Sequence, residues 1–251
     1  MTSDPNTGSG AAEAERINRV YRQYESSCHS SRWSPRNPAN LVVLEEIRAT
    51  ELDLLRQHQC LPDRSTKALD FGCGSGAWLD WLCKLGGSGD NFYGVDIRSE
   101  VVARTAKDHP HLNISLAGDA GLPFPDGFFD FIQMHVVLSS ILDGSFRIQV
   151  CKELDRVLGR AGAILIYDFR INNPRNPNVR GVTRKAISVL FPGYRFHFHS
   201  LSVFPPLSRR LGSWCGLFYP ALKLFPFLRT HNMGLGRKKQ DREIGGTGSS
   251  R

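Results

Sequence analysis

The chain has 251 residues, of which 41% are hydrophobic, and a formal net charge of +8. This size suits one α/β domain with its own core and a small extension, and two full domains would be cramped. No run of 18 apolar residues is present, so we predict no membrane-spanning helix; the polar start lacks a secretory signal, so we expect a cytoplasmic protein.

The first part of the chain is predicted to be helical. Residues 1–12 have few apolar side chains to bury, so we expect a disordered tail. Apolar residues at helical spacing predict a helix over residues 13–23. After a polar segment, a longer amphipathic helix is predicted over residues 38–58, where Pro38 suits the first turn.

Strands and helices then alternate. Strands are predicted over residues 67–73, 91–97, 114–119, 129–137 and 163–169. The intervening helices are predicted over residues 77–85, 99–108 and 145–158, with Ser99 as the N-cap of the second. Strands joined by helices predict right-handed βαβ units, and therefore a parallel sheet with helices on both faces.

The pattern is looser after residue 170. A Pro- and Asn-rich loop over residues 172–178 is followed by a predicted helix and a predicted strand. An aromatic helix and a last strand come next, and the Gly-, Ser- and charge-rich residues 239–251 are predicted to be a second disordered tail. The predicted elements here are helices over residues 180–191 and 208–224 and strands over residues 194–201 and 230–237.

The six cysteines are scattered, and no two of them form a C-x-x-C pair. This spacing argues against both a disulfide framework and a zinc site, and we expect reduced thiols that pack as small apolar groups. We see no other cluster of ligands for a metal, so no metal is expected.

The strongest motif is the loop Asp70-Phe71-Gly72-Cys73-Gly74-Ser75-Gly76, between a predicted strand and a predicted helix. Glycine lets the backbone approach a ligand closely, and open α/β sheets bind ligands where strands end. A phosphate loop is excluded because no Lys-Ser/Thr pair follows Gly76. A dinucleotide fingerprint counted from Gly72 matches only in part, since Ala77 stands at the third glycine. Asp70 can reach the methionine part of a sulfonium cofactor.

The segment ALDFGCGSGAW, residues 68–78, resembles motif I of the class I S-adenosylmethionine-dependent methyltransferases. The resemblance continues in order through residue 168. Asp96 matches the acidic residue that holds both ribose hydroxyls, Asp119 would accept from the adenine amino group, and Ala120 would contact the ring through its backbone. Residues 152–162 resemble the family's helix and turn before strand five, although one glycine, Gly162, stands where the family has a pair.

The resemblance implies S-adenosylmethionine as cofactor, with S-adenosylhomocysteine as product. It also implies a Rossmann-like sheet of seven strands in the order 3-2-1-4-5-7-6, with strand seven antiparallel. Residues 13–60 resemble the helical lid of such enzymes, with Tyr21, Tyr24, Arg32 and Trp33 as lid candidates. Residues 61–238 would form the methyltransferase domain, in which residues 202–229 are a substrate-side insertion. The expected cofactor-binding residues are Asp70, Gly72, Cys73, Gly74, Gly76, Asp96, Ile97, Asp119, Ala120, Met134 and His135.

Catalytic candidates lie at the ends of strands four and five. His135 could take a proton from an acceptor hydroxyl near neutral pH, or it could contact only backbone or cofactor. Tyr167 and Asp168 follow on strand five, where Asp168 could act as a base or cap a loop. His197 and His199 alternate with phenylalanines and are expected at the surface.

The stretch from Arg170 to Lys238 carries twelve of the 32 Lys and Arg residues, no Asp or Glu, and ten aromatic residues. Such a segment suits an anionic or lipid-linked acceptor and peripheral contact with a membrane, although an ordinary core under a basic face has the same composition. We expect methyl transfer to a small molecule, such as a hydroxyl of a sugar, lipid-linked glycan or natural product. The alternatives are an RNA or other nucleic-acid methyltransferase and a non-catalytic binding protein. The sequence leaves the acceptor, the methylated atom and the oligomeric state open.

Overall fold

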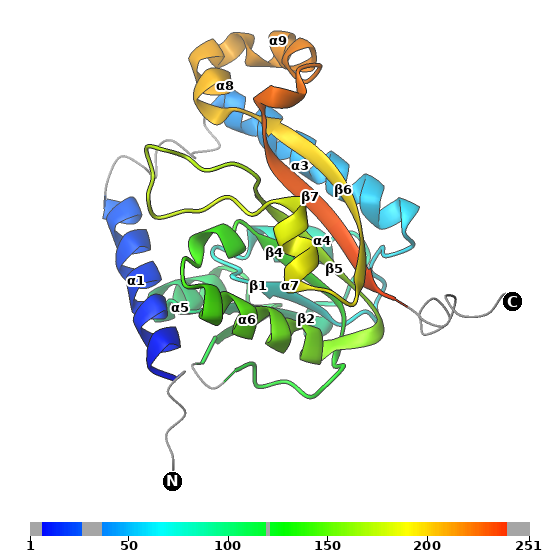
Figure 1. Cartoon of the computed structure of the whole chain (residues 1–251). Coiled ribbons are helices and arrows are strands. Elements are labelled where there is room, and N and C mark those ends of the chain that lie inside the picture. Colours follow the sequence, from blue (N-terminus) through cyan, green and yellow to red (C-terminus); the bar gives the residue numbers. More distant parts are fainter. Residues whose placement is uncertain (1–6, 27–36, 119–120, 240–251) are drawn as a thin grey trace, which may run out of the picture.

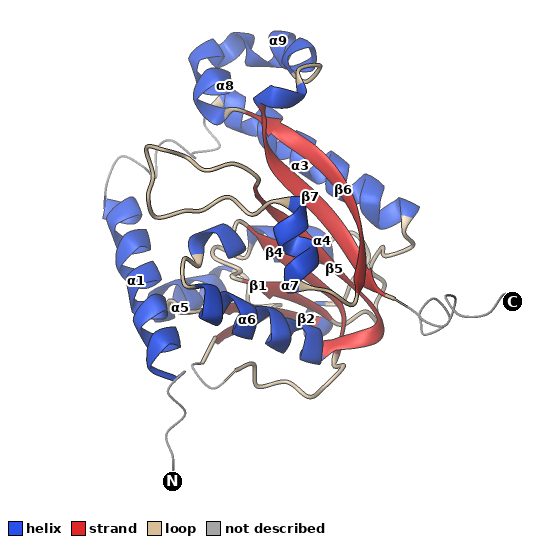
Figure 2. Ribbon diagram, in the orientation of Figure 1, coloured by secondary structure: helices blue, strands red, loops and turns tan. Residues whose placement is uncertain are grey.

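A computed structural model describes residues 7–26, 37–118 and 121–239. Seven strands form one sheet in the order β3-β2-β1-β4-β5-β7-β6, which confirms the expected Rossmann-like α/β fold (Figures 1 and 2). Strands β1 to β5 pair in parallel, whereas β7 is antiparallel to both β5 and β6. The strands are β1 (Ala68–Phe71), β2 (Phe92–Asp96), β3 (Asn113–Leu116), β4 (Phe129–His135), β5 (Leu158–Phe169), β6 (Tyr194–Val203) and β7 (Arg229–Lys238).

Helices cover both faces of the sheet. The helices are α1 (Thr7–Ser26), α3 (Pro38–Gln57), α4 (Ala77–Cys83), α5 (Ser99–Asp108), α6 (Gly144–Val157), α7 (Arg184–Leu190), α8 (Pro205–Leu211) and α9 (Cys215–Leu222). Strand β5 shows how the two cores arise: Ile164 and Ile166 pack with α1, α6 and α7, while Leu165 between them packs with α3 and α4. Successive strand residues point to opposite faces, so the long apolar run of β5 serves both cores.

Several predicted boundaries are wrong. Helix α1 begins at Thr7 rather than at residue 13. Within it, Glu13 accepts hydrogen bonds from the backbone of Leu142 and Asp143. Residues 7–12 therefore do not belong to a disordered tail. Ser99 is not a cap: the N-cap of α5 is Arg98, whose backbone donates to Asp96 instead.

The later elements also differ from prediction. Strand β5 begins at Leu158, and α7 is restricted to Arg184–Leu190. The helix expected over residues 208–224 is divided into α8, a 3-10 turn and α9, because Gly212 at the end of α8 has a positive φ of +51°. Cys28, Arg32, Trp33, Asp119, Ala120 and residues 240–251 lie outside the described residues.

The segment between β6 and β7 lies at the same edge of the sheet as the glycine-rich loop. Because β6 and β5 are both antiparallel to β7, β6 ends at the edge where β1, β2, β4 and β5 end. We call residues 204–228 the cap. The cap packs on α3 through a small apolar cluster centred on Ala39, Val203, Cys215 and Tyr219 (Figure 1). No helix in the described part of the chain has the length and hydropathy needed to cross a bilayer.

Two glycines of β7 allow the outer strand β6 to pack closely. Gly234 pairs with Phe198 and Gly236 with Phe196, and a Cβ atom on Gly234 would lie 2.4 Å from the Phe198 ring. These rings cover the glycines, as aromatic residues often do across strands.

We expect Gly234→Ala to lower the free energy of unfolding by about 1–3 kcal/mol, the usual cost of overpacking. Chemical denaturation of the purified protein measures this cost. Gly193→Ala is the control, because a Cβ there meets no atom within 4 Å. Equal stability of the two variants would contradict the proposed packing.

Candidate functional site

Loops from three neighbouring strands meet at the carboxyl edge of the sheet. In the loop after β1, Gly72, Gly74 and Gly76 have φ values of +78°, +51° and +73°, a region that favours glycine. The backbone nitrogens of Gly72 and Cys73 donate to the carbonyl of Val95 in β2. A Cβ on Gly72 would lie 2.7 Å from Val137, so the loop after β4 packs directly against this glycine.

The loop after β4 begins with a strained residue. Val136 has a φ of +58°, although it is β-branched, and its backbone nitrogen donates to the Tyr167 carbonyl over 2.7 Å. This conformation costs on the order of 1–2 kcal/mol, and such strain is typical of sites where backbone geometry serves function. The turn ends β4 abruptly, directly after His135.

Buried polar atoms without a hydrogen-bond partner gather at this edge. Among the described residues they include atoms of Glu51, Asp70, Gln133, His135 and Ser139. Buried polar groups are normally paired, so this concentration indicates a wall that faces a polar ligand. Burial raises the pKa of Asp70 to about 6, although the nearby His135 opposes that rise.

His135 lies in a pocket of aromatic and charged groups. Its Nε2 atom is 3.1 Å from a carboxylate oxygen of Glu51, and its ring stacks on Trp78 with centroids 4.2 Å apart. Glu51, in α3, is fully buried. Sequence reasoning did not select this residue, although a charged side chain within the apolar stripe of α3 was the available signal.

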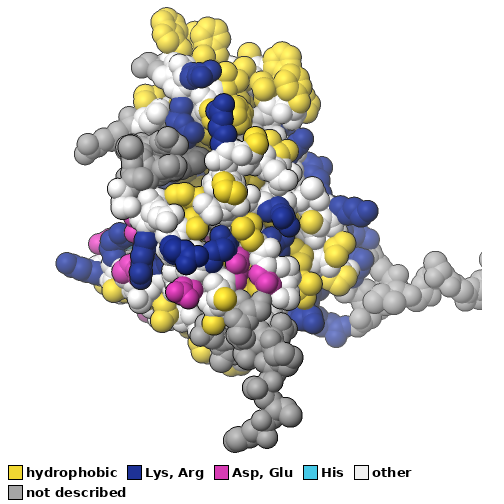
Figure 3. Space-filling model, turned by 60° about the vertical axis from the view of Figure 1, so that its left-hand side comes forward, with side chains coloured by type: hydrophobic (Ala, Val, Ile, Leu, Met, Phe, Trp, Pro, Cys, Tyr) yellow, Lys and Arg dark blue, Asp and Glu magenta, His cyan; other side chains and the backbone are white. Residues whose placement is uncertain are grey.

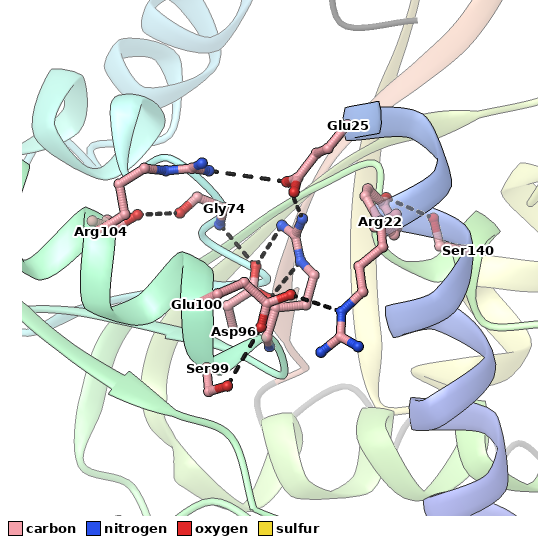
Figure 4. A network of polar contacts seen from close by, with 11 residues as sticks. Arg22, Glu25, Gly74, Asp96, Ser99, Glu100, Arg104 and Ser140 are labelled. Atoms are coloured by element: carbon pink, nitrogen blue, oxygen red, sulfur yellow. Dashed lines mark hydrogen bonds and ion pairs between the residues drawn. The ribbon is translucent and has the colours of Figure 1, made fainter. Parts of the chain in front are cut away.

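Asp96, at the end of β2, accepts four hydrogen bonds. One oxygen accepts from the backbone nitrogen and Nε of Arg98, at 3.0 and 3.1 Å. The other accepts from the backbone nitrogen of Gly74 and from a terminal nitrogen of Arg98, at 3.0 and 3.2 Å (Figure 4). A carboxylate offers about four acceptor positions, so those of Asp96 are all used.

Helix α1 spans the loops after β2 and β4. Tyr21 lies 3.1 Å from the Ser140 hydroxyl, and Glu25 accepts from Arg98 over 3.1 Å. The Arg98 guanidinium also lies 4.6 Å from the centre of the Tyr21 ring. Between α1 and the ends of β2 and β3 lies a cleft of about 330 Å³, lined by residues that include Ile97, Ala117, Gly118 and Phe146.

The other predicted cofactor residues have varied positions. Cys73 is buried, and burial raises the pKa of its thiol. The Met134 side chain lies in the core, and Ile97 lines the cleft. Tyr24, a lid candidate, donates to Asn176. Asp119 and Ala120 lie outside the described residues, although Gly118 directly before them lines the same cleft.

Tyr167 and Asp168 point to opposite faces of the sheet. The Tyr167 hydroxyl is 2.8 Å from the Ser202 hydroxyl, whereas Asp168 accepts from the backbone of Ser139 at 3.0 Å and of Phe169 at 2.7 Å. Both groups therefore have structural partners. His197 and His199 are exposed on β6, as expected.

One cluster in the described residues has the composition of a metal site. Ligand atoms of Asp80, His109 and His111 lie within 4.8 Å of one another, which sequence spacing did not reveal. The Lys84 ammonium lies 2.5 Å from the Asp80 carboxylate and supplies a positive charge there.

Comparison with known proteins identifies the domain type. Residues 69–166 match the family model described as "Methyltransferase domain". A demethylmenaquinone methyltransferase of Staphylococcus saprophyticus is 36% identical over 133 residues, 51% of this chain and 54% of that protein. Another, from Staphylococcus carnosus, is 25% identical over 190 residues, 74% of this chain and 68% of that protein. The chain spans about half the length of the first two curated relatives it matches.

A solved structure supports the same fold. The putative sarcosine dimethylglycine methyltransferase from Galdieria sulphuraria superposes with a TM-score of 0.59 at 18% identity, covering 78% of this chain and 85% of that one. Together with the strand order, the family match shows that residues 69–166 form a methyltransferase domain.

The buried Asp168 predicts a pH-dependent stability. Burial raises its pKa from 3.8 to about 6, although the Ser139 backbone donor opposes the rise. The folded state therefore favours the neutral acid, and this carboxyl favours folding below pH 3.8 and loses that contribution as pH rises through 6. The stability of Asp168→Asn relative to the parent protein should increase by about 2 kcal/mol between pH 4 and pH 7.

Urea unfolding at both pH values measures this change. An increase of that size would support a destabilising ionisation of the buried Asp168 carboxyl, whereas a difference in stability that does not change with pH would contradict it. Asp108→Asn, on the exposed end of α5, is the control and should leave the pH dependence unchanged.

Proposed function

We propose that the protein transfers a methyl group from S-adenosylmethionine to a small, largely apolar acceptor at the carboxyl edge of its sheet. The observation that carries this proposal is the set of unpartnered buried polar atoms around the loops after β1 and β4. Bound there, the cofactor supplies a methyl group on a sulfonium, which makes the methyl carbon the target of an in-line displacement.

The proposed cofactor residues follow the loops. Asp70 and the glycines 72, 74 and 76 would lie along the methionine part, and the cleft beside Ile97 would hold the adenine. Asp119 and Ala120 remain proposed adenine contacts from the sequence motif, and Cys73, Met134 and His135 remain proposed neighbours of the cofactor. The polar wall and the positive φ angles support this arrangement.

Arg98 occupies the acceptor positions that a ribose would need. Its side chain uses one position on each oxygen of Asp96, while backbone groups use the others. Withdrawal of this side chain would free one acceptor position on each oxygen, which matches the two hydroxyls of a ribose. Glu25 and the Tyr21 ring already contact Arg98 and would hold its charge after such a movement.

Two substitutions with opposite expected effects test this role. Asp96→Ala removes the ribose acceptor and should weaken binding of S-adenosylhomocysteine at least tenfold, because two hydrogen bonds to a charged group are lost. Arg98→Ala removes the competitor and should tighten binding severalfold. Isothermal titration calorimetry measures both constants.

Arg104→Ala is the matched control, because this partly exposed arginine also lies near Glu25 but does not touch Asp96. Unchanged affinity in Asp96→Ala would refute the ribose site. Weaker affinity in Arg98→Ala would refute the competition.

We propose His135 as the general base, positioned by Glu51. A hydrogen bond from Nε2–H to Glu51 fixes the tautomer that leaves a lone pair on Nδ1, and Nδ1 is buried without a partner. An acceptor hydroxyl can then give its proton to Nδ1 while its oxygen, or a ring carbon conjugated with it, bonds the methyl carbon and the sulfur leaves with the bonding electron pair. A ring carbon methylated in this way then loses its hydrogen as a proton, which restores the aromatic ring. The Trp78 ring fixes the imidazole plane. Tyr167 and Asp168 have no role in this mechanism, because the Tyr167 hydroxyl contacts Ser202 and the Asp168 carboxylate accepts from the backbone of Ser139 and Phe169.

We expect Glu51→Gln to lower kcat about 10- to 100-fold, because an amide can accept from Nε2–H but does not stabilise the protonated imidazole. His135→Asn should lower it further. The probe acceptor is reduced demethylmenaquinone in detergent micelles, with methyl transfer followed by mass spectrometry. Glu51→Gln should not change the dissociation constant of S-adenosylhomocysteine by more than about threefold.

Glu45→Gln, on an exposed position of the same helix, is the control and should retain full activity. The assignment would be wrong if Glu51→Gln kept the parent kcat, or if its acid limb were identical to that of the parent in the pH profile of kcat.

The acceptor is proposed to be apolar and aromatic rather than a free sugar. The rings of Trp78 and Tyr167 lie beside His135, and the curated relatives are named for a demethylated menaquinone. Of the acceptors predicted from sequence, a natural product or lipid-linked molecule fits these rings better than a free sugar. The proposal includes peripheral contact with a membrane, where such an acceptor dissolves.

A further inference from the structure

The outer surface of the cap is unusually apolar. Thirteen large hydrophobic side chains are exposed in the described residues, and seven of them lie within this one short segment. They are Phe204, Trp214, Leu217, Phe218, Leu224, Phe225 and Phe227. Figure 3 shows hydrophobic side chains gathered at the end of the molecule formed by α8 and α9.

This surface is not required for the packing of the cap. Cys215 and Tyr219 point inward from α9 and are buried against α3, whereas Leu217 and Phe218 on the same helix are 68% and 48% exposed. Leu224 and Phe227 are 76% and 74% exposed. Since the cap already has an inner core, these side chains leave a second apolar face in contact with solvent, which is typical of an interaction surface.

The charges around this face have one sign. Arg209, Arg210 and Lys223 lie in the cap and Arg229 directly follows it, and no acidic residue occurs between residues 170 and 238. The Arg229 guanidinium donates to the carbonyls of Lys223 and Ser200, whereas Arg210 is exposed. Among the described residues, Glu46 in α3 is an acid that faces the cap. Glu46 is engaged by the Tyr219 hydroxyl at 2.6 Å and the Lys223 ammonium at 3.2 Å. The cap is therefore apolar at its end and basic around it.

We propose that the cap docks on an anionic phospholipid bilayer, with its apolar side chains in the interfacial region and its basic side chains on lipid phosphates. Aromatic and leucine side chains with Lys and Arg beside them are typical of segments that lie in this region. This docking has a consequence that rests on the proposed function: the methyl acceptor is an apolar molecule that is dissolved in the same membrane.

The position of the cap fits this consequence. His135 pairs with Tyr167, which pairs with Met233 in β7, and the cap ends at the beginning of β7, four residues before Met233. Two strand spacings of about 4.8 Å and four strand residues of about 3.3 Å each combine to a separation of about 16 Å. An acceptor whose reacting ring lies beside His135 therefore needs an apolar tail of about this length to reach the cap.

A second copy of the chain fits the surface less well. A twofold contact through the cap would bring the same patch of each copy together. The Arg and Lys residues around the patch would then face their equivalents across the contact, and like charges in such a position are unfavourable. An anionic bilayer satisfies both the apolar and the basic groups.

Sedimentation with sucrose-loaded vesicles tests the proposal on the full chain. The cap variant is Leu217→Ser/Leu224→Ser/Phe227→Ser, and the matched control is Leu61→Ser/Ile148→Ser/Val189→Ser, which changes three exposed apolar residues elsewhere. We expect the parent protein and the control to bind phosphatidylglycerol-containing vesicles and the cap variant to bind at least fivefold more weakly. Pure phosphatidylcholine should bind the parent at least fivefold more weakly than the anionic vesicles.

Arg210→Glu should also weaken binding to anionic vesicles severalfold, with Lys107→Glu as the exposed control. Calorimetry with S-adenosylhomocysteine is run in parallel on each variant, so that loss of the cofactor site is distinguished from loss of docking. Unchanged thermal unfolding of the cap variant excludes misfolding as the cause.

The proposal is overturned if the parent protein stays in solution with anionic vesicles, or if the cap variant binds as well as the parent. It is also overturned if light scattering shows that the parent is a dimer, the cap variant is a monomer, and the two bind vesicles equally. If any of these results occurs while S-adenosylhomocysteine still binds as in the parent, the membrane proposal fails and the proposed methyl transfer does not.

Discussion

The parallel strands end at one edge of the sheet, and the polar groups buried there need hydrogen-bond partners in place of water. Asp70, Asp96 and Asp168 lie at the ends of β1, β2 and β5 and are all nearly inaccessible. A buried carboxylate is stable only where donors replace water. The loops after these strands therefore take shapes that deliver backbone nitrogens: Gly74 and Arg98 to Asp96, and Ser139 and Phe169 to Asp168. The positive φ of Gly74 accompanies its contact with Asp96.

Helix α1 satisfies part of this need from outside the sheet. Glu13 accepts from the loop after β4, and Glu25 from Arg98 beside β2, so one helix is attached at both ends to loops of the site. Residues of α1, among them Ala14 and Asn18, line the cleft beside Ile97. Arg98 joins Asp96 to Glu25 of this helix through two ion pairs.

Local patterns were sufficient to predict most of the architecture. The alternation of apolar runs with amphipathic segments predicted the strands, and the resemblance of the motifs to the class I methyltransferases implied their order. Contacts between distant segments could not be predicted in this way. Glu51 meets His135 across 84 residues, and the Arg98 side chain turns back onto Asp96. The division of the cap at Gly212 depends on a backbone angle that the apolar composition of the segment does not specify.

Helix α3 connects the two halves of the proposed function. Near its middle, Glu46 accepts from Tyr219 and from the backbone of Ser202, at the base of the cap. Glu51, about one and a half turns further on, contacts His135. A rigid helix transmits displacement without large internal change, so a force on the cap that moves Glu46 also moves Glu51. Docking of the cap on a bilayer would then do more than bring the acceptor close: it would act on the carboxylate that orients the base. The two carboxylates have different surroundings, since Glu46 is paired with a lysine and a tyrosine, whereas one Glu51 oxygen has no partner. Glu46 is suited to hold the cap, and Glu51 is suited to stabilise a proton on His135.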